Sequence, residues 1–328
     1  MDSPIAWLLE GPPWIQYRTR LDLLDESKDS PQVLAAHKAM IADPQIQGLL
    51  AKLSNWPEST LTTHKAAGHP LHKLTFIADL GLDINDSGID EILRRIVEHQ
   101  SPEGPFQILV NISPKYGGTG QDQWAWMLCD APLIVYALTK LGFKGDDQLQ
   151  AAKRHLITLI RDNGWPCTVA PELGKFRGPG SKSDPCPYAN LLMLKMLTTM
   201  ASDSVEDVAK TATETLLDLW ETRKQRRPYM FAMGTDFVKL KAPLLWYDIL
   251  HVTDVLAHFP WTHSDPRFQQ MTDIVQSKVD AQGRFMAESI WRDWKEWDFG
   301  QKRTPSHWIT MVTLRMLNRC GKYCAPEG

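Results

Sequence analysis

Two kinds of apolar pattern alternate along the chain. One kind is apolar most of the way round a helical turn and begins at a proline, as in the runs that follow Pro132 and Pro187. The other has apolar residues on a single face, as at Val205, Val208 and Ala212. An all-round apolar helix is typical of a buried position, whereas a one-faced helix covers a core. The alternation therefore predicts buried inner helices covered by outer helices.

The all-round runs recur at intervals of 55 to 62 residues, beginning at Pro13, Pro70, Pro132, Pro187, Pro243 and Pro305. Proline suits the first turn of a helix, where its missing N–H would have no partner. The one-faced runs lie between them, at 31–53, 87–99, 146–162, 204–223 and 266–279. Ser204 with Asp207 resembles a capping box, and 106–112 is the best strand candidate. Six such units predict one all-α domain over 1–328, an (α/α)6 toroid of alternating inner and outer helices, with an open solenoid as the alternative.

Several one-faced runs end in a glycine followed by an aromatic residue. The examples are Gly104-Pro-Phe106, Gly164-Trp165 and Gly283-Arg-Phe285. Glycine is common at the left-handed position that ends a helix. With Gln100 ahead of it, the first turn resembles the Gln…Gly-x-Trp turn of the squalene-cyclase and prenyltransferase repeat families. The likeness spans residues 10–320 as a repeat plan and implies an α/α toroid. The Asp-x-Asp-Asp acid motif of those families has no match; the nearest sequence, at 83–86, departs at its third position.

Composition and charge narrow the class of protein. The chain has 328 residues, of which 43% are hydrophobic and 23% charged, and its net charge is −3. This disfavours nucleic-acid binding, which needs a basic stripe. The N-terminus lacks the pattern of a secretory signal, and no apolar run approaches the roughly 20 residues of a membrane span. Five scattered cysteines predict a reducing, cytoplasmic location rather than a disulfide framework.

A closed ring would place the starts of all inner helices at one mouth. Helix N-termini attract anions, and the loops entering that mouth carry Tyr116, Lys175 and Arg177. We expect these side chains to bind an anionic group, the alternative being that they are solvated loop residues. Aromatic and imidazole side chains near the same ends are expected to contact a substrate: Trp124, Trp126, Tyr188, Trp246, Tyr247, His307 and Trp308.

Acidic and histidine side chains near the helix starts are the catalytic candidates. Asp130 lies two positions before Pro132 and close to two tryptophans, which suits either a proton donor of raised pKa or a helix N-cap. On the fifth inner helix, polar residues recur on one face: Tyr247, His251, Asp254 and His258. Asp248 neighbours that face. A histidine flanked by Asp at both i−3 and i+3 could act as a general base, and a buried structural network is the alternative.

Two cysteines also fall near the mouth. Cys167 and Cys186 flank the loop 168–186. A catalytic thiol and a small buried apolar residue are both consistent with such a position. Neither cysteine is part of a tight ligand spacing such as Cys-x-x-Cys, so neither a metal nor a cofactor is expected.

Together these residues predict an intracellular lyase, isomerase or cyclase. It would act by acid–base chemistry on a largely apolar, terpene-like small molecule in a central cavity, with or without an anionic group. Asp130, or Asp248 with His251, would move protons, and aromatic faces would stabilise cations. One alternative is a glycosidase or lyase acting on short oligosaccharides, uronic acids included, with Asp130 and Asp248 as its carboxylate pair. A second is a non-catalytic binding module. The oligomeric state stays open.

Overall fold

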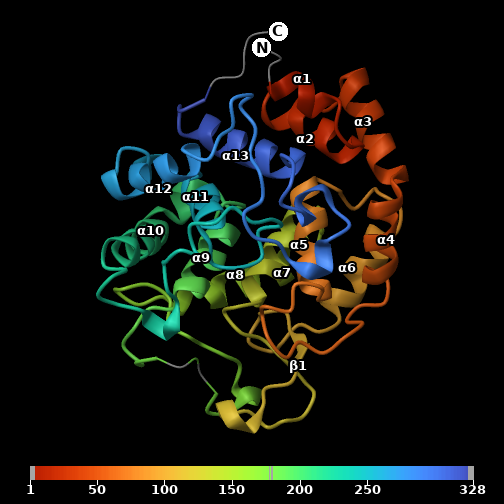
Figure 1. Ribbon diagram of the computed structural model, residues 1–328. Coiled ribbons are helices and arrows are strands. Elements are labelled where there is room, and N and C mark those ends of the chain that lie inside the picture. Colours follow the sequence, from red (N-terminus) through yellow and green to blue (C-terminus); the bar gives the residue numbers. More distant parts are fainter. Residues whose placement is uncertain (1–3, 177, 179, 324–328) are drawn as a thin grey trace. The chain divides into compact units, whose positions relative to one another are not determined.

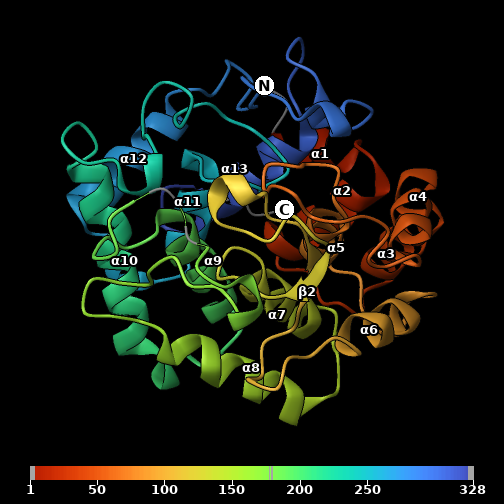
Figure 2. The same ribbon diagram turned by 90° about the horizontal axis from the view of Figure 1, so that it is seen from below.

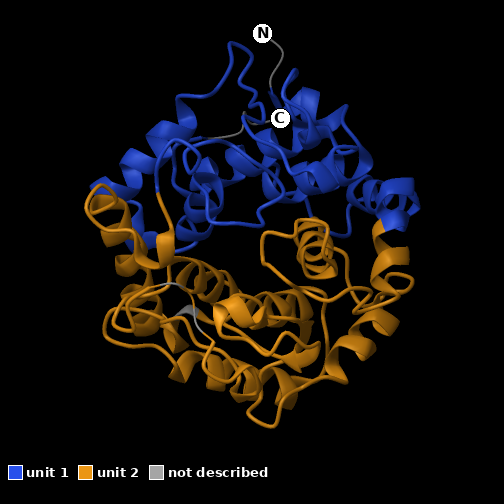
Figure 3. Cartoon of the chain, turned by 60° about the horizontal axis from the view of Figure 1, so that its bottom comes forward, with its two compact units in different colours: residues 1–48, 233–328 blue, residues 49–232 orange. Residues whose placement is uncertain are grey.

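Helices dominate the computed structural model, which describes residues 4–176, 178 and 180–323 (Figure 1). Within these ranges there are thirteen α-helices and a single two-stranded sheet, so the expectation of a mostly helical fold is confirmed. The chain divides into two compact units, coloured separately in Figure 3. Unit 1 comprises residues 1–48 and 233–328, and unit 2 comprises residues 49–232.

Unit 2 shows the expected two kinds of helix. Its helices are α5 (Pro70–Leu80), α6 (Ile89–Val97), α7 (Ala131–Lys140), α8 (Asp146–Thr158), α9 (Pro187–Leu197) and α10 (Glu206–Glu221). Helices α5, α7 and α9 are buried along nearly their whole length and pack in that order. Helices α8 and α10 bury one face each, against α7 and α9 respectively. Within unit 2, the assignment of inner and outer helices is therefore confirmed.

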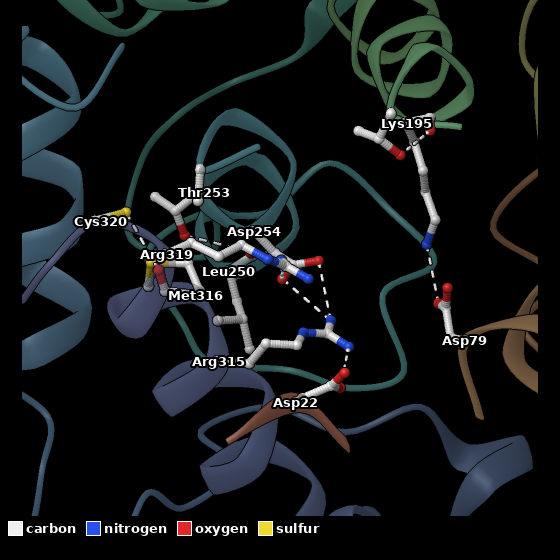
Figure 4. A network of polar contacts seen from close by, with 12 residues as sticks. Asp22, Asp79, Lys195, Leu250, Thr253, Asp254, Arg315, Met316, Arg319 and Cys320 are labelled. Atoms are coloured by element: carbon white, nitrogen blue, oxygen red, sulfur yellow. Dashed lines mark hydrogen bonds and ion pairs between the residues drawn. The ribbon is translucent and has the colours of Figure 1, made fainter. Parts of the chain in front are cut away.

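The three inner helices of unit 2 run in the same direction. Near their C-terminal ends, Asp79 of α5 accepts hydrogen bonds from the Tyr136 hydroxyl of α7, at 2.7 Å, and from Lys195 Nζ of α9, at 2.9 Å. Figure 4 shows the Lys195–Asp79 contact. At the opposite ends, Cys129 before α7 interacts with Cys186 at the start of α9. Because contacts join like ends, these helix starts lie together.

Unit 1 contains the first and last helices of the described chain. They are α1 (Pro4–Leu9), α2 (Pro13–Asp22), α3 (Pro31–Ala42), α11 (Ile249–Leu256), α12 (Pro266–Gln276) and α13 (His307–Arg319). Helix α13 packs against α2 and α11, while α3 covers α2 and α12 covers α11. Arg315 of α13 binds Asp22 at the end of α2 and Asp254 of α11 (Figure 4). Helix α4 (Pro44–Leu53) crosses the boundary between the two units in the sequence.

The prolines mark helix starts less regularly than their spacing predicts. Four lie in the first turn of a helix: Pro13, Pro70, Pro132 and Pro187. The prediction is wrong for Pro243, which lies in an irregular segment, and for Pro305, which precedes the N-cap of α13. At these two starts a side chain caps the helix instead. Asp248 accepts the His251 N–H, and Ser306 accepts the N–H of the third helical residue.

The one-faced runs form helices in the expected places, with two differences. Four runs correspond to α6, α8, α10 and α12, which Figure 2 shows from a second direction. The run 31–53 is broken at Asp43, whose carboxylate accepts the N–H groups of Gln45 and Ile46 and so starts α4 as a new helix. The capping box is wrong, because Ser204 Oγ donates to the Ala201 carbonyl and α10 begins after Val205.

The strand expected within 106–112 is confirmed over three residues. Strand β1 (Ile108–Val110) pairs antiparallel with β2 (Gln123–Ala125), so that Leu109 lies opposite Trp124. The sequence did not indicate β2, because a three-residue strand is too short to show an alternating pattern. The yellow connection between the strands lies beside the green segment that follows α8 at the bottom of Figure 1. A Cβ added to Gly117 would come within 3.8 Å of the Phe176 Cα.

Two of the glycine–aromatic turns are built alike. In each, the carbonyl of the aromatic residue accepts the N–H of the N-cap residue of the next inner helix. The N–H of the aromatic residue donates to a side chain four residues after that N-cap. The sets are Trp165 with Cys186 and Asn190, and Phe285 with Ser306 and Thr310. The distances run from 2.7 to 2.9 Å. This repeated connection ties the end of an outer helix to the start of an inner helix.

The first turn uses its glutamine in the same kind of connection. Gln100 Nε2 donates to the carbonyls of Gly104 and Gln148, at 2.7 and 2.9 Å. Gly104 has a φ of +116°, and a Cβ there would lie 2.7 Å from the Ala151 carbonyl oxygen. Glycine is thus required because the turn packs directly on the backbone of α8.

Candidate functional site

Chemically active side chains gather at the shared starts of α5, α7 and α9. We call this set the helix-start cluster, and its members are His64, Cys129, Asp130, Cys167, Cys186 and Tyr188. All six belong to unit 2. The sequence patterns predicted four of them and missed His64 and Cys129.

Histidines hold the loop that carries His64. His69 Nε2 donates to the Ser59 carbonyl, and His72 Nε2 donates to the His64 carbonyl, both at 3.0 Å. His69 Nδ1 also accepts the Leu71 N–H, which caps α5. Burial lowers the pKa of His69 to about 4, so the ring is neutral at pH 7 and its Nδ1 can accept this bond. The loop is therefore fixed at both of its ends.

His64 pairs with a buried carboxylate. Its Nε2 lies 3.2 Å from Asp130 Oδ2, and the other oxygen, Oδ1, accepts the Met127 N–H at 2.8 Å. An ionised carboxylate only accepts hydrogen bonds, so Nε2 is the donor in this pair, and in a neutral imidazole the lone pair then lies on Nδ1. Asp130 is fully buried, whereas the His64 side chain is 15% exposed. This is the geometry of an imidazole base oriented by a carboxylate.

Asp130 is at the N-cap position of α7 but does not cap it with its side chain. The expected side-chain cap is therefore wrong, because the carboxylate bonds to His64 and to the Met127 N–H instead, and the function of proton donor stays a prediction. The two tryptophans that lie shortly before Asp130 in the sequence make other contacts. The Trp124 ring stacks on His99, with 3.4 Å between ring centroids, and Trp126 Nε1 donates to Glu103 at 2.9 Å. A substrate contact for either tryptophan stays a prediction.

The thiols of Cys129 and Cys186 shift each other's pKa. A hydrogen bond from the Cys129 thiol is the largest effect that lowers the pKa of Cys186, and the N–H groups of Ala189 and Tyr188 add to it. The same bond, together with burial, raises the pKa of Cys129. Cys167 Sγ accepts the Gly178 N–H at 3.1 Å. Cys186 therefore ionises more readily than Cys129.

Aromatic rings border the imidazole. Tyr188, in the first turn of α9, is buried and lies edge-on to His64, with 6.4 Å between ring centroids. Phe231 stacks on the other side of Tyr188 at 6.3 Å. The Tyr229 hydroxyl donates to the carbonyls of Ser181 and Asp184, and burial raises its pKa. The base is thus placed beside an apolar, aromatic surface.

The basic loop residues lie apart from these contacts or outside the description. Tyr116 ends a short 3-10 helix and is 62% exposed, and Lys175 is also exposed. Arg177 lies outside the described residues. Anion binding by these side chains stays a prediction.

A second set of candidates surrounds the start of α11 in unit 1. Asp248 caps this helix, because Oδ1 accepts the His251 N–H at 3.0 Å. Its buried Oδ2 has no hydrogen-bond partner among the described residues, and burial raises the pKa of Asp248 to about 7. His251 Nδ1 donates to the Trp246 carbonyl at 2.8 Å, and the Tyr247 ring lies 5.3 Å from Phe237.

The polar face expected on this helix is not present as predicted. Helix α11 ends at Leu256, and Tyr247 precedes its N-cap, so Tyr247 and His258 both lie outside it. The early start expected at Pro243 caused this error. Asp254 binds the guanidinium groups of Arg315 and Arg319, at 3.1 and 3.0 Å, and so belongs to an ion-pair network.

His307 and Trp308 open α13 beside another buried acid. The His307 ring stacks on Trp7 at 3.8 Å, and burial lowers its pKa. Trp308 is buried, and its N–H donates to Asp298 Oδ2 at 3.1 Å. Ser306 Oγ also donates to Asp298 Oδ2, at 2.8 Å, while burial raises the pKa of this carboxyl group. These contacts fix the start of α13.

Sequence features could have revealed the two missed members of the cluster. His64 stands in a group with His69 and His72 around the start of an inner helix, and the search for prolines did not consider this group. Cys129 precedes Cys186 by 57 residues, which is one repeat interval. Side chains one interval apart fall at equivalent helix starts and can meet when those helices are neighbours.

Among the described residues, no group of three or more His, Cys, Asp or Glu side chains is arranged to hold a metal ion. None of the described helices has the length and apolar character needed to cross a membrane. Neither the scan against family models nor the comparison with curated proteins finds a match to the chain. The function therefore has to be argued from the site itself.

Proposed function

We propose that the protein is an enzyme that moves protons on a small, largely apolar molecule, with His64 as its general base. The observation that carries this proposal is the 3.2 Å pairing of His64 Nε2 with Asp130. A lyase, an isomerase and a cyclase all need such a step.

The chemistry follows from the charges of the pair. Neutral His64 accepts a proton at Nδ1, and the imidazolium that forms is stabilised by the buried Asp130 carboxylate. The Met127 N–H holds the other carboxylate oxygen in place, which keeps the ring in the productive orientation. The same imidazolium can then return the proton to a different carbon atom. Tyr188 and Phe231 supply the aromatic surface that suits an apolar substrate or a cationic intermediate.

We also propose that the inner helices form the closed (α/α)6 toroid of the sequence analysis, and that the protein works in a reducing cytoplasm. The common direction of α5, α7 and α9 and the matching turns at Trp165 and Phe285 support the toroid. Cys129 and Cys186, whose thiols form no disulfide, support the location. The carbohydrate alternative needs Asp130 and Asp248 as one pair; they belong to different units, and that alternative stays a prediction.

A ligand screen tests the proposal first. Thermal shifts are measured with farnesol, farnesyl diphosphate, oleate and digalacturonate. An apolar compound is expected to raise the melting temperature, since a ligand bound only to the native state stabilises it. If digalacturonate alone stabilises the protein, carbohydrate chemistry replaces the proposal. If no compound does, the small-molecule hypotheses fail together.

Isotope exchange then tests the base. The stabilising compound is incubated with the protein in D₂O, and deuterium incorporation is followed by mass spectrometry. His64→Gln should slow incorporation by about 10²–10⁴-fold, the usual contribution of a general base. Asp130→Asn should slow it as well, because the amide cannot stabilise the imidazolium. His263→Gln is the matched control, since His263 belongs to unit 1, where its ring bonds to the Ala257 carbonyl and stacks on Phe268. Exchange by His64→Gln at the wild-type rate would refute the proposed base.

A further inference from the structure

Backbone hydrogen bonds bring three cysteines of unit 2 together. The Trp165 carbonyl accepts the Cys186 N–H at 2.7 Å, and the Thr168 carbonyl accepts the Leu128 N–H at 3.1 Å. The segment 165–168 thus joins the start of α9 to the residue that precedes Cys129. Cys167 lies within this segment. Segments that are distant in the sequence therefore deliver three thiols to one place.

The two helix-start thiols have different environments. Interaction with the Cys129 thiol lowers the pKa of Cys186, and the N–H groups of Tyr188 and Ala189 in the first turn of α9 act in the same direction. Helix N-termini favour a thiolate. Cys129 is next to the Asp130 carboxylate, which favours its protonated form. The pKa values of the two thiols are thus shifted in opposite directions, which suits a nucleophile and its resolving partner.

The equivalent helix start in unit 1 provides a comparison. Ser306 has the same turn connection as Cys186, and its hydroxyl caps α13 by accepting the Ile309 N–H at 3.1 Å. The Cys186 side chain makes no regular capping bond. Serine at position 186 would therefore serve the helix at least as well as cysteine. A capping function therefore does not explain why residue 186 is a cysteine.

We propose that Cys129 and Cys186 form a peroxide-sensitive dithiol that closes reversibly to a disulfide. This site is independent of the base proposed above. Hydrogen peroxide suits it because Cys186 is only 3% exposed and Cys129 is partly exposed, so the oxidant has to be small.

Oxidation of the dithiol by hydrogen peroxide takes two steps. The Cys186 thiolate attacks one peroxide oxygen, the O–O bond breaks, and sulfenic acid and hydroxide form. The Cys129 sulfur then attacks the Cys186 sulfur and breaks its S–O bond, and the sulfenic hydroxyl leaves as water with the Cys129 proton. The hydroxide of the first step becomes water by taking from solvent the proton that Cys186 lost when it ionised. In total, one peroxide and two thiols give one disulfide and two waters. The two electrons pass from sulfur to the peroxide oxygens, and an added dithiol reverses the change.

Mass spectrometry of the full chain tests the proposal. The reduced protein is treated with one equivalent of hydrogen peroxide, its remaining thiols are blocked with N-ethylmaleimide, and its peptides are mapped. We expect a mass decrease of about 2 Da before blocking, which corresponds to the loss of two hydrogens. We also expect two fewer maleimide adducts and a peptide that links Cys129 to Cys186. Dithiothreitol should restore both thiols.

Variants separate the two roles. In Cys129→Ser, the sulfenic acid on Cys186 has no resolving thiol and should be trapped by dimedone. In Cys186→Ser, whose fold is checked by circular dichroism, no disulfide should form at one equivalent of peroxide. Cys320→Ser is the control and should behave as wild type, because burial raises the pKa of Cys320 to about 11 and leaves it unreactive. A disulfide that joins Cys167 to either partner, or a wild-type protein that stays reduced, would overturn the assignment. Neither result depends on catalytic activity.

Discussion

Removing Arg315 should destabilise unit 1 more than any removal of an exposed charge. Its side chain is 10% exposed and bridges Asp22 of α2 and Asp254 of α11, at 3.3 and 3.1 Å. In Arg315→Met a similar volume is kept while two carboxylates lose a partner. Removing one partner of a buried ion pair costs about 3–5 kcal/mol. Asp254 keeps Arg319 and Asp22 keeps Arg18, so we expect the lower end, about 3 kcal/mol.

The melting temperature measures this loss. For a domain of roughly 150–250 residues, a loss of about 1 kcal/mol lowers the melting temperature by roughly 2–4 °C. A loss of about 3 kcal/mol should therefore lower the melting temperature of Arg315→Met by about 6–12 °C at pH 7. Hydrogen exchange should show the lost protection in α2, α11 and α13. Arg94→Met is the matched control: Arg94 is 61% exposed and pairs with acids of its own helix, where solvent screens the charges, so its removal should change the melting temperature little. Equal melting temperatures for the two variants would refute the reasoning.

The pH dependence gives a second measurement on the same network. Burial acts to raise the pKa of Asp22, but the guanidinium groups of Arg18 and Arg315 outweigh it and hold the pKa below its usual 3.8. A lowered pKa stabilises the folded state above the unfolded value, and this contribution is lost as the pH falls through the folded value. In Arg315→Met the pKa of Asp22 is lowered less, so the stability lost on acidification, measured as melting temperature against pH, should be smaller and complete at a higher pH than in the wild type.

Two further predictions concern single residues. Gly164→Ala should destabilise unit 2 far more than Gly88→Ala in thermal melts. Both glycines have positive φ, but a Cβ at 164 would lie 2.5 Å from Asn190 Oδ1, whereas a Cβ at 88 would meet nothing within 4 Å. Equal losses of stability would show that backbone strain alone decides. Asp248→Asn should flatten the pH dependence of stability between about pH 4 and 7. In the wild type, the raised pKa of Asp248 stabilises the fold below the usual 3.8, and this stabilisation is lost as the pH rises to about 7. Asparagine does not titrate but can still cap the helix. An unchanged melting profile for this variant would contradict the raised pKa.

The helix starts show where sequence patterns succeed and where they fail. At Pro187 the all-round apolar run and the start of α9 coincide, because proline and burial act locally. At Pro243 an apolar run leads to Asp248, the N-cap of α11, and hydrophobicity does not reveal that this run is irregular. The Asp248 cap decides that start, and its role depends on a hydrogen bond with a residue three positions later.

The site shows the same division. Asp130 was found because it stands beside a helix start, but its partner was not, because His64 is 66 residues away and lies in a loop. Only the packing of α5 against α7, with two other histidines bonded to the loop backbone, brings the pair together.

The sequence by itself determined the mostly helical fold, the alternation of buried and covering helices and the turns that need glycine. These follow from interactions between residues a few positions apart, which a periodic pattern records. The tertiary structure decided which helix starts are neighbours, and so which side chains react together: His64 with Asp130, and Cys129 with Cys186. Contacts between distant segments depend on how whole helices pack, and no local pattern of residues encodes that choice.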